Sequence, residues 1–343
     1  MIPISLGRRK KRIERCHVAA LADFVKGNLA NFKATFSSRC PYVTAYLNLI
    51  CSYAVEELLV WSVEEMRQAV RACEAYLPQG AFYSKRDPNL EELEFKRANQ
   101  ELLKVFDYDW FARPKTGWSL GELALELSKV VRVCPYCNAE TVYAYKVSGG
   151  KFKIVKSSFD HYFPQARYPF LALSLYNLIP ACSRCNTSFK GDKYEGLLEM
   201  AHPYASDEGI HDGMKYRLLF KDAKAISNCQ AEGLEGVLLT ERGVIGSFEK
   251  GIRQERLFKT SETYTALYRP VAADALWKSL RYSSAYLDLM AKKLKRSGMT
   301  RDRLERLMCG ASLDAKDINL NCHGKMIQDI YETYSSVVGY VDE

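Results

Sequence analysis

Two pairs of cysteines are the first residues whose spacing predicts chemistry. Cys134 and Cys137 form one CxxC pair, and Cys182 and Cys185 form a second pair after 44 intervening residues. Two such pairs supply the four thiolates that a tetrahedral Zn²⁺ takes in a structural site. The intervening length exceeds the loop of the commonest zinc fingers. We therefore expect a segment inserted between the pairs that carries the function.

Two other chemistries of these cysteines are weaker alternatives. Cys134-Pro135-Tyr136-Cys137 is also the active-site tetrapeptide of glutaredoxin-like proteins. No βαβ pattern surrounds it here, and a redox role leaves the second pair unexplained. A zinc deaminase needs an H-x-E motif, which none of the five histidines begins. Structural zinc is therefore the favoured interpretation.

The segment between the two pairs carries a second set of polar residues. It holds Asp160-His161-Tyr162-Phe163-Pro164 and, before the second pair, Tyr176-Asn177-Leu178-Ile179-Pro180; Asn186 and Lys190 follow the last cysteine. This order closely resembles the HNH endonucleases, whose ββα-metal site is often braced by a four-cysteine zinc. The resemblance covers residues 134–193, about sixty residues.

The resemblance assigns a role to each matching residue. It implies that His161 is the catalytic base that activates water, and that Asn177 orients the imidazole. It implies that Asp160 and Asn186 ligate a catalytic Mg²⁺ or Mn²⁺. Lys190, one helical turn after Asn186, is then expected to contact a phosphate near the metal.

Elementary chemistry agrees with these roles. Phosphodiester cleavage uses a hard cation held by oxygen ligands and a base beside the attacking water. Asp160 offers a carboxylate and Asn186 an amide oxygen, a donor set that favours magnesium. An imidazole with an unperturbed pKa of about 6.5 suits the base. Adjacent residues on an ideal strand point to opposite faces, so Asp160 and His161 both face the metal only if the strand ends or bends near Pro164.

Positive charge is concentrated near this motif. Residues 134–194 hold eight basic and three acidic residues, in a chain of net charge +8. We expect four of these side chains to contact nucleic acid: Lys156, Arg184, Lys190 and Lys193. A second stretch, 278–306, holds nine basic and three acidic residues. A phosphate-binding face and an ordinary solvated face both fit this stretch.

The pattern of apolar residues predicts the elements that position these side chains. Apolar positions recur at helical spacing from His17 to about Val131, and again from Phe248 onward. Two β segments, 141–145 and 152–155, flank Ser148-Gly149-Gly150, which predicts a hairpin. The remaining predictions are a helix from near Ser183 and two strands, 216–220 and 237–244.

We therefore expect an α+β fold in which a ββα-metal module lies between mainly helical regions. The expected divisions are a helical region 1–130, the HNH module with its zinc pairs at 131–204, and a mainly helical region 205–343 with a strand pair. The composition, 48% hydrophobic, suffices for a large core, and no stretch approaches the ~18 apolar residues of a membrane helix. With no apolar targeting segment and an odd number of cysteines, 11, we expect a cytoplasmic protein.

These observations favour a metal-dependent HNH endonuclease with a structural zinc, acting on DNA in preference to RNA. The large helical flanks are similar to those of HNH subunits of bacterial anti-phage defence systems that work beside an ATPase. The chain has no GxxxxGKS or GxxxxGKT motif, so any ATP dependence requires a partner protein.

The alternative is a non-catalytic zinc ribbon that binds nucleic acid or a protein. The combination of Asp160, His161 and Asn186 favours catalysis, since binding alone needs no base beside metal ligands.

Overall fold

Helices make up the N-terminal part of the chain. The computed structural model describes residues 2–78, 89–114, 116–146, 153–155, 158–191, 193, 196–205, 213–241 and 248–335. The N-terminal helices are α1 (Lys10–Thr35), α2 (Pro41–Ser52), α3 (Val55–Leu58), α4 (Val63–Glu74), α5 (Leu90–Val105), α6 (Tyr108–Ala112) and α7 (Leu120–Leu127). The prediction of a helical N-terminal region is confirmed.

Local sequence explains where two of these helices begin. Ser62 caps α4, accepting a hydrogen bond from the Glu65 amide while the Glu65 carboxylate accepts from the Ser62 amide. Asn89 and Glu92 form the same reciprocal box at the start of α5. Each box satisfies two amide groups that a helix end leaves without a partner.

Three two-stranded antiparallel sheets follow. They pair β1 (Ala144–Lys146) with β2 (Lys153–Val155), β3 (Ser158–His161) with β4 (Leu178–Ala181), and β5 (Met214–Phe220) with β6 (Leu234–Glu241). The predicted hairpin strands and the later strand pair are confirmed. The turn expected at Ser148-Gly149-Gly150 lies outside the described residues.

A helical segment follows β4 directly, close to the predicted start at Ser183. This is η4 (Arg184–Lys190), a π-helix, whose turn is wider than that of an α-helix. The candidate site thus lies in an antiparallel strand pair, β3 and β4, that is followed by the helix η4.

The C-terminal region is again mainly helical, as predicted. Its helices are α9 (Lys224–Asn228), α10 (Phe248–Phe258), α11 (Thr260–Leu267), α12 (Arg269–Arg281), α13 (Ser284–Lys293), α14 (Arg301–Leu304), the π-helix η8 (Glu305–Cys309) and α15 (Gly324–Tyr334). Short 3-10 segments are η1 (Gly7–Arg9), η2 (Pro169–Leu171), η3 (Leu175–Asn177), η5 (Leu197–Glu199), η6 (Ala231–Gly233), η7 (Lys295–Ser297) and η9 (Ala315–Leu320).

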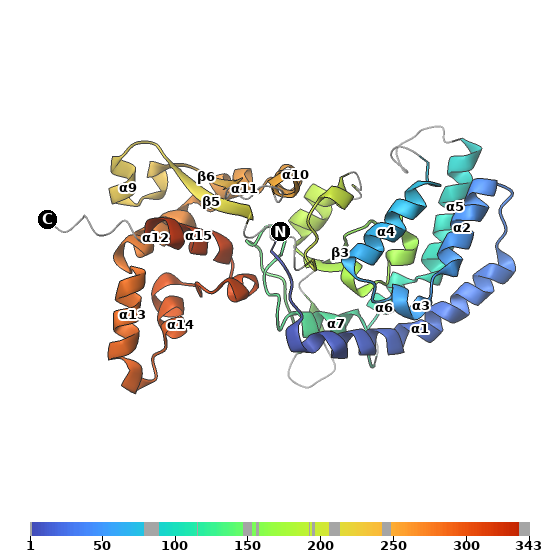
Figure 1. The fold of residues 1–343 in the computed structure, drawn as a ribbon, viewed down its shortest axis with the longest axis horizontal. Helices are drawn as coiled ribbons and strands as arrows, with labels where there is room; N and C mark the ends of the chain where they lie inside the picture. The colour runs from blue at the N-terminus through green and yellow to red at the C-terminus, as the bar shows by residue number, and fades with distance from the viewer. Residues whose placement is uncertain are drawn as a thin grey trace.

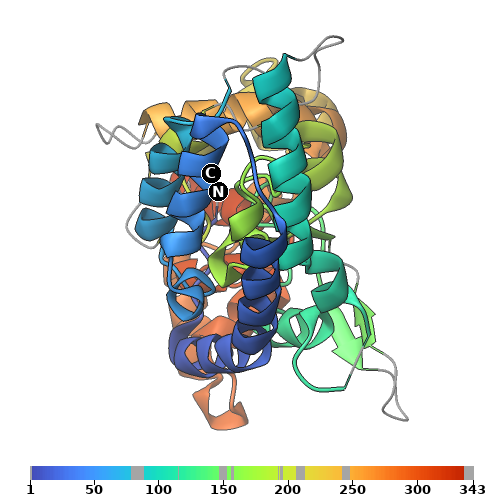
Figure 2. The same ribbon diagram turned by 90° about the vertical axis from the view of Figure 1, so that its right-hand side faces the viewer.

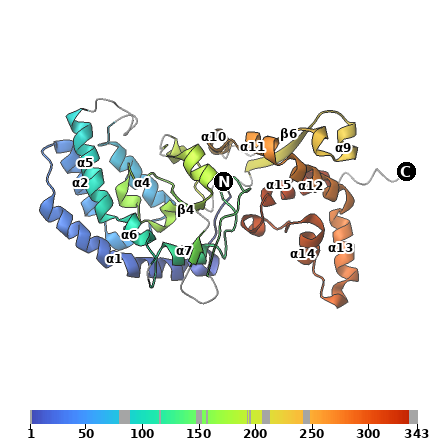
Figure 3. The same cartoon turned by 180° about the vertical axis from the view of Figure 1, so that it is seen from behind.

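The two helical regions lie at opposite ends of the molecule. Figure 1 shows α1 to α6 at one end and α12 to α15 at the other, with the segment that contains the cysteine pairs and β3 between them. Figure 2 looks onto the N-terminal end, where α1, α2 and α5 are in front. Figure 3 shows the same order from behind. The segment with the candidate site therefore lies between the two helical regions.

The core is continuous across these regions. One buried apolar cluster includes Ile13 of α1, the cysteine pairs and Tyr331 of α15. Tyr264 of α11 is fully buried, as expected for a core residue, and its ring lies 5.2 Å from that of Tyr268. No helix in the described ranges has both the length and the apolar surface needed to cross a membrane.

Candidate metal centre and active site

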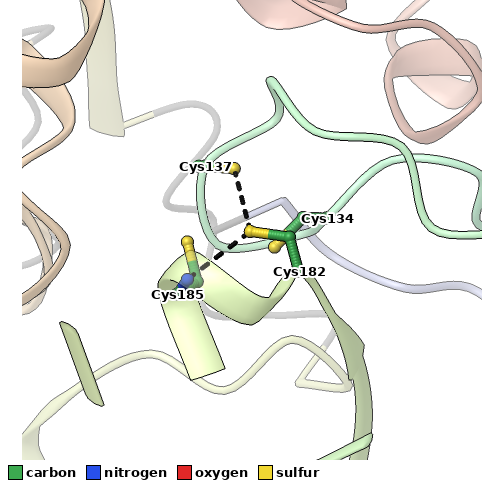
Figure 4. Close-up of side chains that lie close together, drawn as sticks. All are labelled: Cys134, Cys137, Cys182 and Cys185. Carbon is green, nitrogen blue, oxygen red and sulfur yellow. Dashed lines mark hydrogen bonds between the residues drawn. The ribbon is translucent and has the colours of Figure 1, made fainter. Parts of the chain in front are cut away.

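Four cysteine sulfurs come together from the two CxxC pairs. The Sγ atoms of Cys134, Cys137, Cys182 and Cys185 all lie within 4.8 Å of one another, and Figure 4 shows the side chains converging. Ligands at about 2.3 Å around a tetrahedral Zn²⁺ lie about 3.8 Å apart. The Sγ atoms of Cys137 and Cys182 are 3.9 Å apart. The four thiols therefore fit a metal such as zinc, and their predicted convergence is confirmed.

Backbone geometry holds the first pair in position. The Asn138 amide donates to the Cys134 carbonyl at 2.8 Å, which closes the turn. Asn138 has a φ of 52°, a left-handed conformation that asparagine adopts more readily than most residues. The Tyr264 hydroxyl donates to the Cys137 carbonyl at 3.0 Å. The C-terminal region thus braces the metal centre.

Asp160 lies in β3 with both carboxylate oxygens engaged. Its side chain is 3% exposed; Oδ1 accepts from Lys190 Nζ at 2.9 Å, and Oδ2 accepts from the Tyr136 hydroxyl at 2.5 Å. Burial and then the Asp160 charge raise the pKa of Tyr136 well above its usual range, so the phenol keeps its proton and donates. Lys190, 1% exposed, also donates to the His161 carbonyl at 2.8 Å. Asp160 therefore joins the first cysteine pair, β3 and η4.

These contacts bear directly on the expected magnesium site. One Asp160 oxygen already accepts a hydrogen bond from the Lys190 ammonium, and the other accepts one from the Tyr136 phenol. Asn186 is partly buried in η4, and no hydrogen bond joins it to Asp160 in the part of the chain that the structure describes. A Mg²⁺ bound at Asp160 would therefore have to share its carboxylate oxygens with these two donors or displace one of them. The Lys190 ammonium is bonded to Asp160 and to the His161 carbonyl, and its contact with a phosphate stays a prediction.

His161 contacts a different set of neighbours from Asp160. Its Nε2 lies 3.0 Å from the Ala172 carbonyl, and its ring meets Tyr108 edge-on at 4.6 Å between centroids. A carbonyl oxygen only accepts, so Nε2 carries the proton and Nδ1 keeps its lone pair. Burial lowers the pKa of His161 to about 4, which keeps the ring neutral at pH 7. The imidazole is in the form that accepts a proton.

The alternation of strand residues is thus retained at this site. The sequence set a strand end or a bend near Pro164 as the condition for Asp160 and His161 to face one metal. β3 does end at His161, but the two side chains bond to separate partners. The side-chain period of two along a strand accounts for the difference.

Asn177 bonds the backbone of the loop that contacts His161. Its Nδ2 donates to the carbonyls of Phe163 and Leu171, both at 3.0 Å, and its Oδ1 accepts from the Phe163 amide at 2.8 Å. Leu171 directly precedes Ala172, whose carbonyl bonds the imidazole. The predicted positioning role is therefore indirect, because no hydrogen bond joins Asn177 to the His161 ring among the described residues.

A third side chain holds the same loop and was not predicted. The carbonyls of residues 171–173 accept in turn from Asn177, His161 and His17, the last at 2.7 Å. His17 is fully buried in α1, and the Trp118 indole donates to its other ring nitrogen at 3.3 Å. Burial lowers the pKa of His17 to about 4. The sequence offered no local signal, since His17 and its partner are 156 residues apart.

The other residues expected to contact nucleic acid differ in availability. Arg184 forms an ion pair with Glu140 at 3.7 Å and lies beside the cysteine cluster. Lys193 is exposed, and its ammonium donates to the Phe189 carbonyl at 2.7 Å. Lys156 lies outside the described residues. Within the described residues, Lys193 is therefore the exposed one of these three cations.

Comparisons with known proteins add no relative. No protein-family model, no curated protein and no solved structure matches this chain. The functional argument therefore rests on the residues and their geometry.

Proposed function

We propose that this chain is an HNH-type endonuclease that hydrolyses phosphodiester bonds in nucleic acid, with DNA as the first substrate. One observation carries the proposal: a neutral imidazole, His161, at the end of the first strand of an antiparallel pair that leads into a helix, with a four-thiol cluster tying the module together. A zinc ribbon needs the cluster but has no use for an oriented base.

His161 is proposed as the base. The Ala172 carbonyl fixes the tautomer with the proton on Nε2, so Nδ1 is the atom that takes a proton from water. The low pKa of His161, caused by burial, keeps this lone pair available at pH 7. Asn177 and the loop that it fixes keep the imidazole in this orientation.

Dependence on Mg²⁺ or Mn²⁺ is a separate part of the proposal. Asp160 and Asn186 are the oxygen donors at hand, and a bound cation would supply charge stabilisation at the scissile phosphate. Because Asp160 is bonded to Lys190 and Tyr136, cation binding requires the carboxylate to share its oxygens with these donors or to leave one of them. Comparing EDTA with Mg²⁺ tests this part independently of His161.

A non-catalytic zinc module is the second candidate, and one observation favours it. The buried Tyr136–Asp160–Lys190 contacts give each carboxylate oxygen a hydrogen-bond donor, as in a purely structural network. Such a protein would bind nucleic acid or a protein through its surface and would cleave nothing. The two candidates therefore differ in one measurable property, hydrolysis that depends on His161.

The test is a cleavage assay on the purified full chain. Labelled duplex DNA, single-stranded DNA and tRNA are incubated with Mg²⁺, Mn²⁺ or EDTA. We expect metal-dependent cleavage that His161→Ala lowers by roughly 10²- to 10⁴-fold. Thr187→Ala, an exposed position on η4, is the matched control and should retain full activity. Absence of cleavage on all three substrates, or equal cleavage by His161→Ala, contradicts the proposal.

A partner protein and a cellular location complete the proposal. We place the chain in the cytoplasm, where reducing conditions keep zinc-binding thiols available. An ATPase subunit of an anti-phage complex is the proposed partner, since the chain lacks a GxxxxGKS or GxxxxGKT motif. Co-expression with the product of a neighbouring ATPase gene should yield a complex with altered cleavage. A chain that purifies alone and cleaves at an unchanged rate beside that product argues against the partner.

A further inference from the structure

α13 is a helix with one narrow packed side. Leu287 is its one buried residue, and Met290 and Leu294 pack partly against the core at the spacing of one helical face. Ala291 is partly buried beside them, and the other residues of the helix are exposed. Figures 1 and 3 both show α13 along the outer edge of the C-terminal end, with no other helix on its far side.

The end of this helix carries a cluster of unpaired cations. Four exposed basic side chains follow closely: Lys292, Lys293, Lys295 and Arg296. None of them forms an ion pair within the described ranges. The neighbouring cations behave differently, because Lys278 is paired with Asp274 and Arg306 with Asp317. Asp288, the one acidic residue of α13, is neutralised by Arg301 at 2.5 Å.

Exposed large apolar side chains lie on the same helix as these cations. Tyr286 is 38% exposed and Leu289 48% exposed, and both share a helical face with Lys293. Close by, the Arg281 guanidinium lies 4.7 Å from the centre of the Trp277 ring. Apolar groups of this kind fit many partners, so they do not decide what binds. The charge identifies the partner, because four neighbouring cations that have no acidic partner among the described residues complement a polyanion.

We infer that the outer face of α13, continued through Lys295 and Arg296, binds the phosphate backbone of duplex nucleic acid. The inference rests on the proposed function, since it gives that nuclease a second hold on its substrate. α13 and β3 lie in different parts of the molecule (Figure 1). A duplex that contacts both must be longer than one that reaches the cleavage site alone. The α13 face therefore favours long substrates over short ones.

The test replaces the four cations together by glutamine, as Lys292→Gln, Lys293→Gln, Lys295→Gln and Arg296→Gln. The control removes four exposed, scattered cations that have no ion pair among the described residues: Arg39→Gln, Lys96→Gln, Lys221→Gln and Lys224→Gln. Both variants lose the same charge. The substitutions are on the surface, so the fold should persist, which circular dichroism checks.

Binding to a labelled duplex of about 40 base pairs is measured in EDTA over a range of salt concentrations. Each lost phosphate contact lowers the slope of log K against log salt by about 0.9, or about fivefold in Kd near 0.15 M salt. We expect the α13 variant to lose two to four contacts, about 25- to 600-fold in Kd. The control variant should lose far less.

Three results of the binding experiment would overturn the inference: wild-type protein that does not bind the duplex, an unchanged salt slope in the α13 variant, or an equal loss in the control. Binding in EDTA is read separately from cleavage. Binding that needs α13 without any cleavage would refute the nuclease and keep the surface, now as that of a binding protein. Cleavage with full activity in the α13 variant, on long and short duplexes alike, would keep the nuclease and refute the surface.

Discussion

Lys190→Met should strongly destabilise the protein, because it breaks a buried ion pair. The Lys190 and Asp160 side chains are 1% and 3% exposed and 2.9 Å apart. Removing one partner of such a pair leaves an uncompensated buried charge, at a cost of about 3–5 kcal/mol. The variant also leaves the His161 carbonyl without its donor at 2.8 Å, which adds about 1 kcal/mol. Asp160→Asn should cost about as much, since it leaves the ammonium unpaired.

The double variant separates the pair from its surroundings. Asp160→Asn with Lys190→Met removes both charges and keeps an amide oxygen as the acceptor for the Tyr136 hydroxyl. Its cost should therefore be no larger than that of either single change. The corresponding coupling free energy is about 3 kcal/mol or more, well above the typical error of additivity for independent sites.

The assay is urea unfolding followed by intrinsic fluorescence, applied to wild type, both single variants and the double variant. Lys193→Met, an exposed lysine three residues along, is the control and should change the free energy of unfolding by less than about 0.5 kcal/mol. Additive effects of the two single changes would refute the ion pair. So would a Lys190→Met variant as stable as the Lys193→Met control.

Three further predictions concern the metal centre and the loop beside it. Metal analysis should find one zinc per chain, and Cys185→Ser should cost folded protein, because zinc ligation contributes folding energy; zinc-free, folded wild type would contradict this. Asn177→Ala should lower the free energy of unfolding by about 2–5 kcal/mol, since it leaves the buried amide and carbonyl of Phe163 unpaired and removes one of the two donors to the Leu171 carbonyl; a variant as stable as wild type would contradict this. For His17, burial lowers the pKa from 6.5 to about 4, so the unfolded chain binds more protons between these values and stability falls as pH falls. In wild type this loss in the free energy of unfolding reaches about 3 kcal/mol. Urea titrations over the same pH range should show a smaller loss for His17→Gln, and an equal pH dependence of the two proteins would refute the prediction.

The fold could be predicted where the pattern of apolar residues is periodic. Helical spacing gave the N-terminal and C-terminal helices, and the flanking β segments of a glycine turn gave β1 and β2. The helix expected from near Ser183 was correct in position, and its π-helical form was not predicted. An apolar pattern does not distinguish an α-helix from a π-helix, because the difference is one hydrogen-bond step, as between the Asn186 carbonyl and the Gly191 amide.

At the candidate site, the cysteines were predictable for a physical reason that the polar residues lack. One metal imposes a common point on four thiols, so spacing alone implies their convergence. No such constraint determines whether a carboxylate binds a metal ion from solvent or a lysine ammonium of the same protein. Each oxygen of Asp160 accepts a hydrogen bond from the protein: one from Tyr136, which precedes it in the sequence, and one from Lys190, which follows it. The sequence contained both partners but gave no measure of their distance.

The loop between β3 and β4 shows why the helical flanks belong to the site. The Leu175 amide donates to the Leu59 carbonyl at 2.8 Å, and the Ser174 hydroxyl donates to the Leu58 carbonyl at 2.5 Å. With His17, these bonds tie the loop to α1 and to the α3 region, across the expected boundary near residue 130. They fix the backbone whose carbonyl orients His161. A catalytic base must keep its position within a fraction of an ångström. Here helices distant in the sequence hold the loop that contacts the His161 imidazole. The N-terminal helices therefore supply part of the positioning on which the proposed chemistry depends.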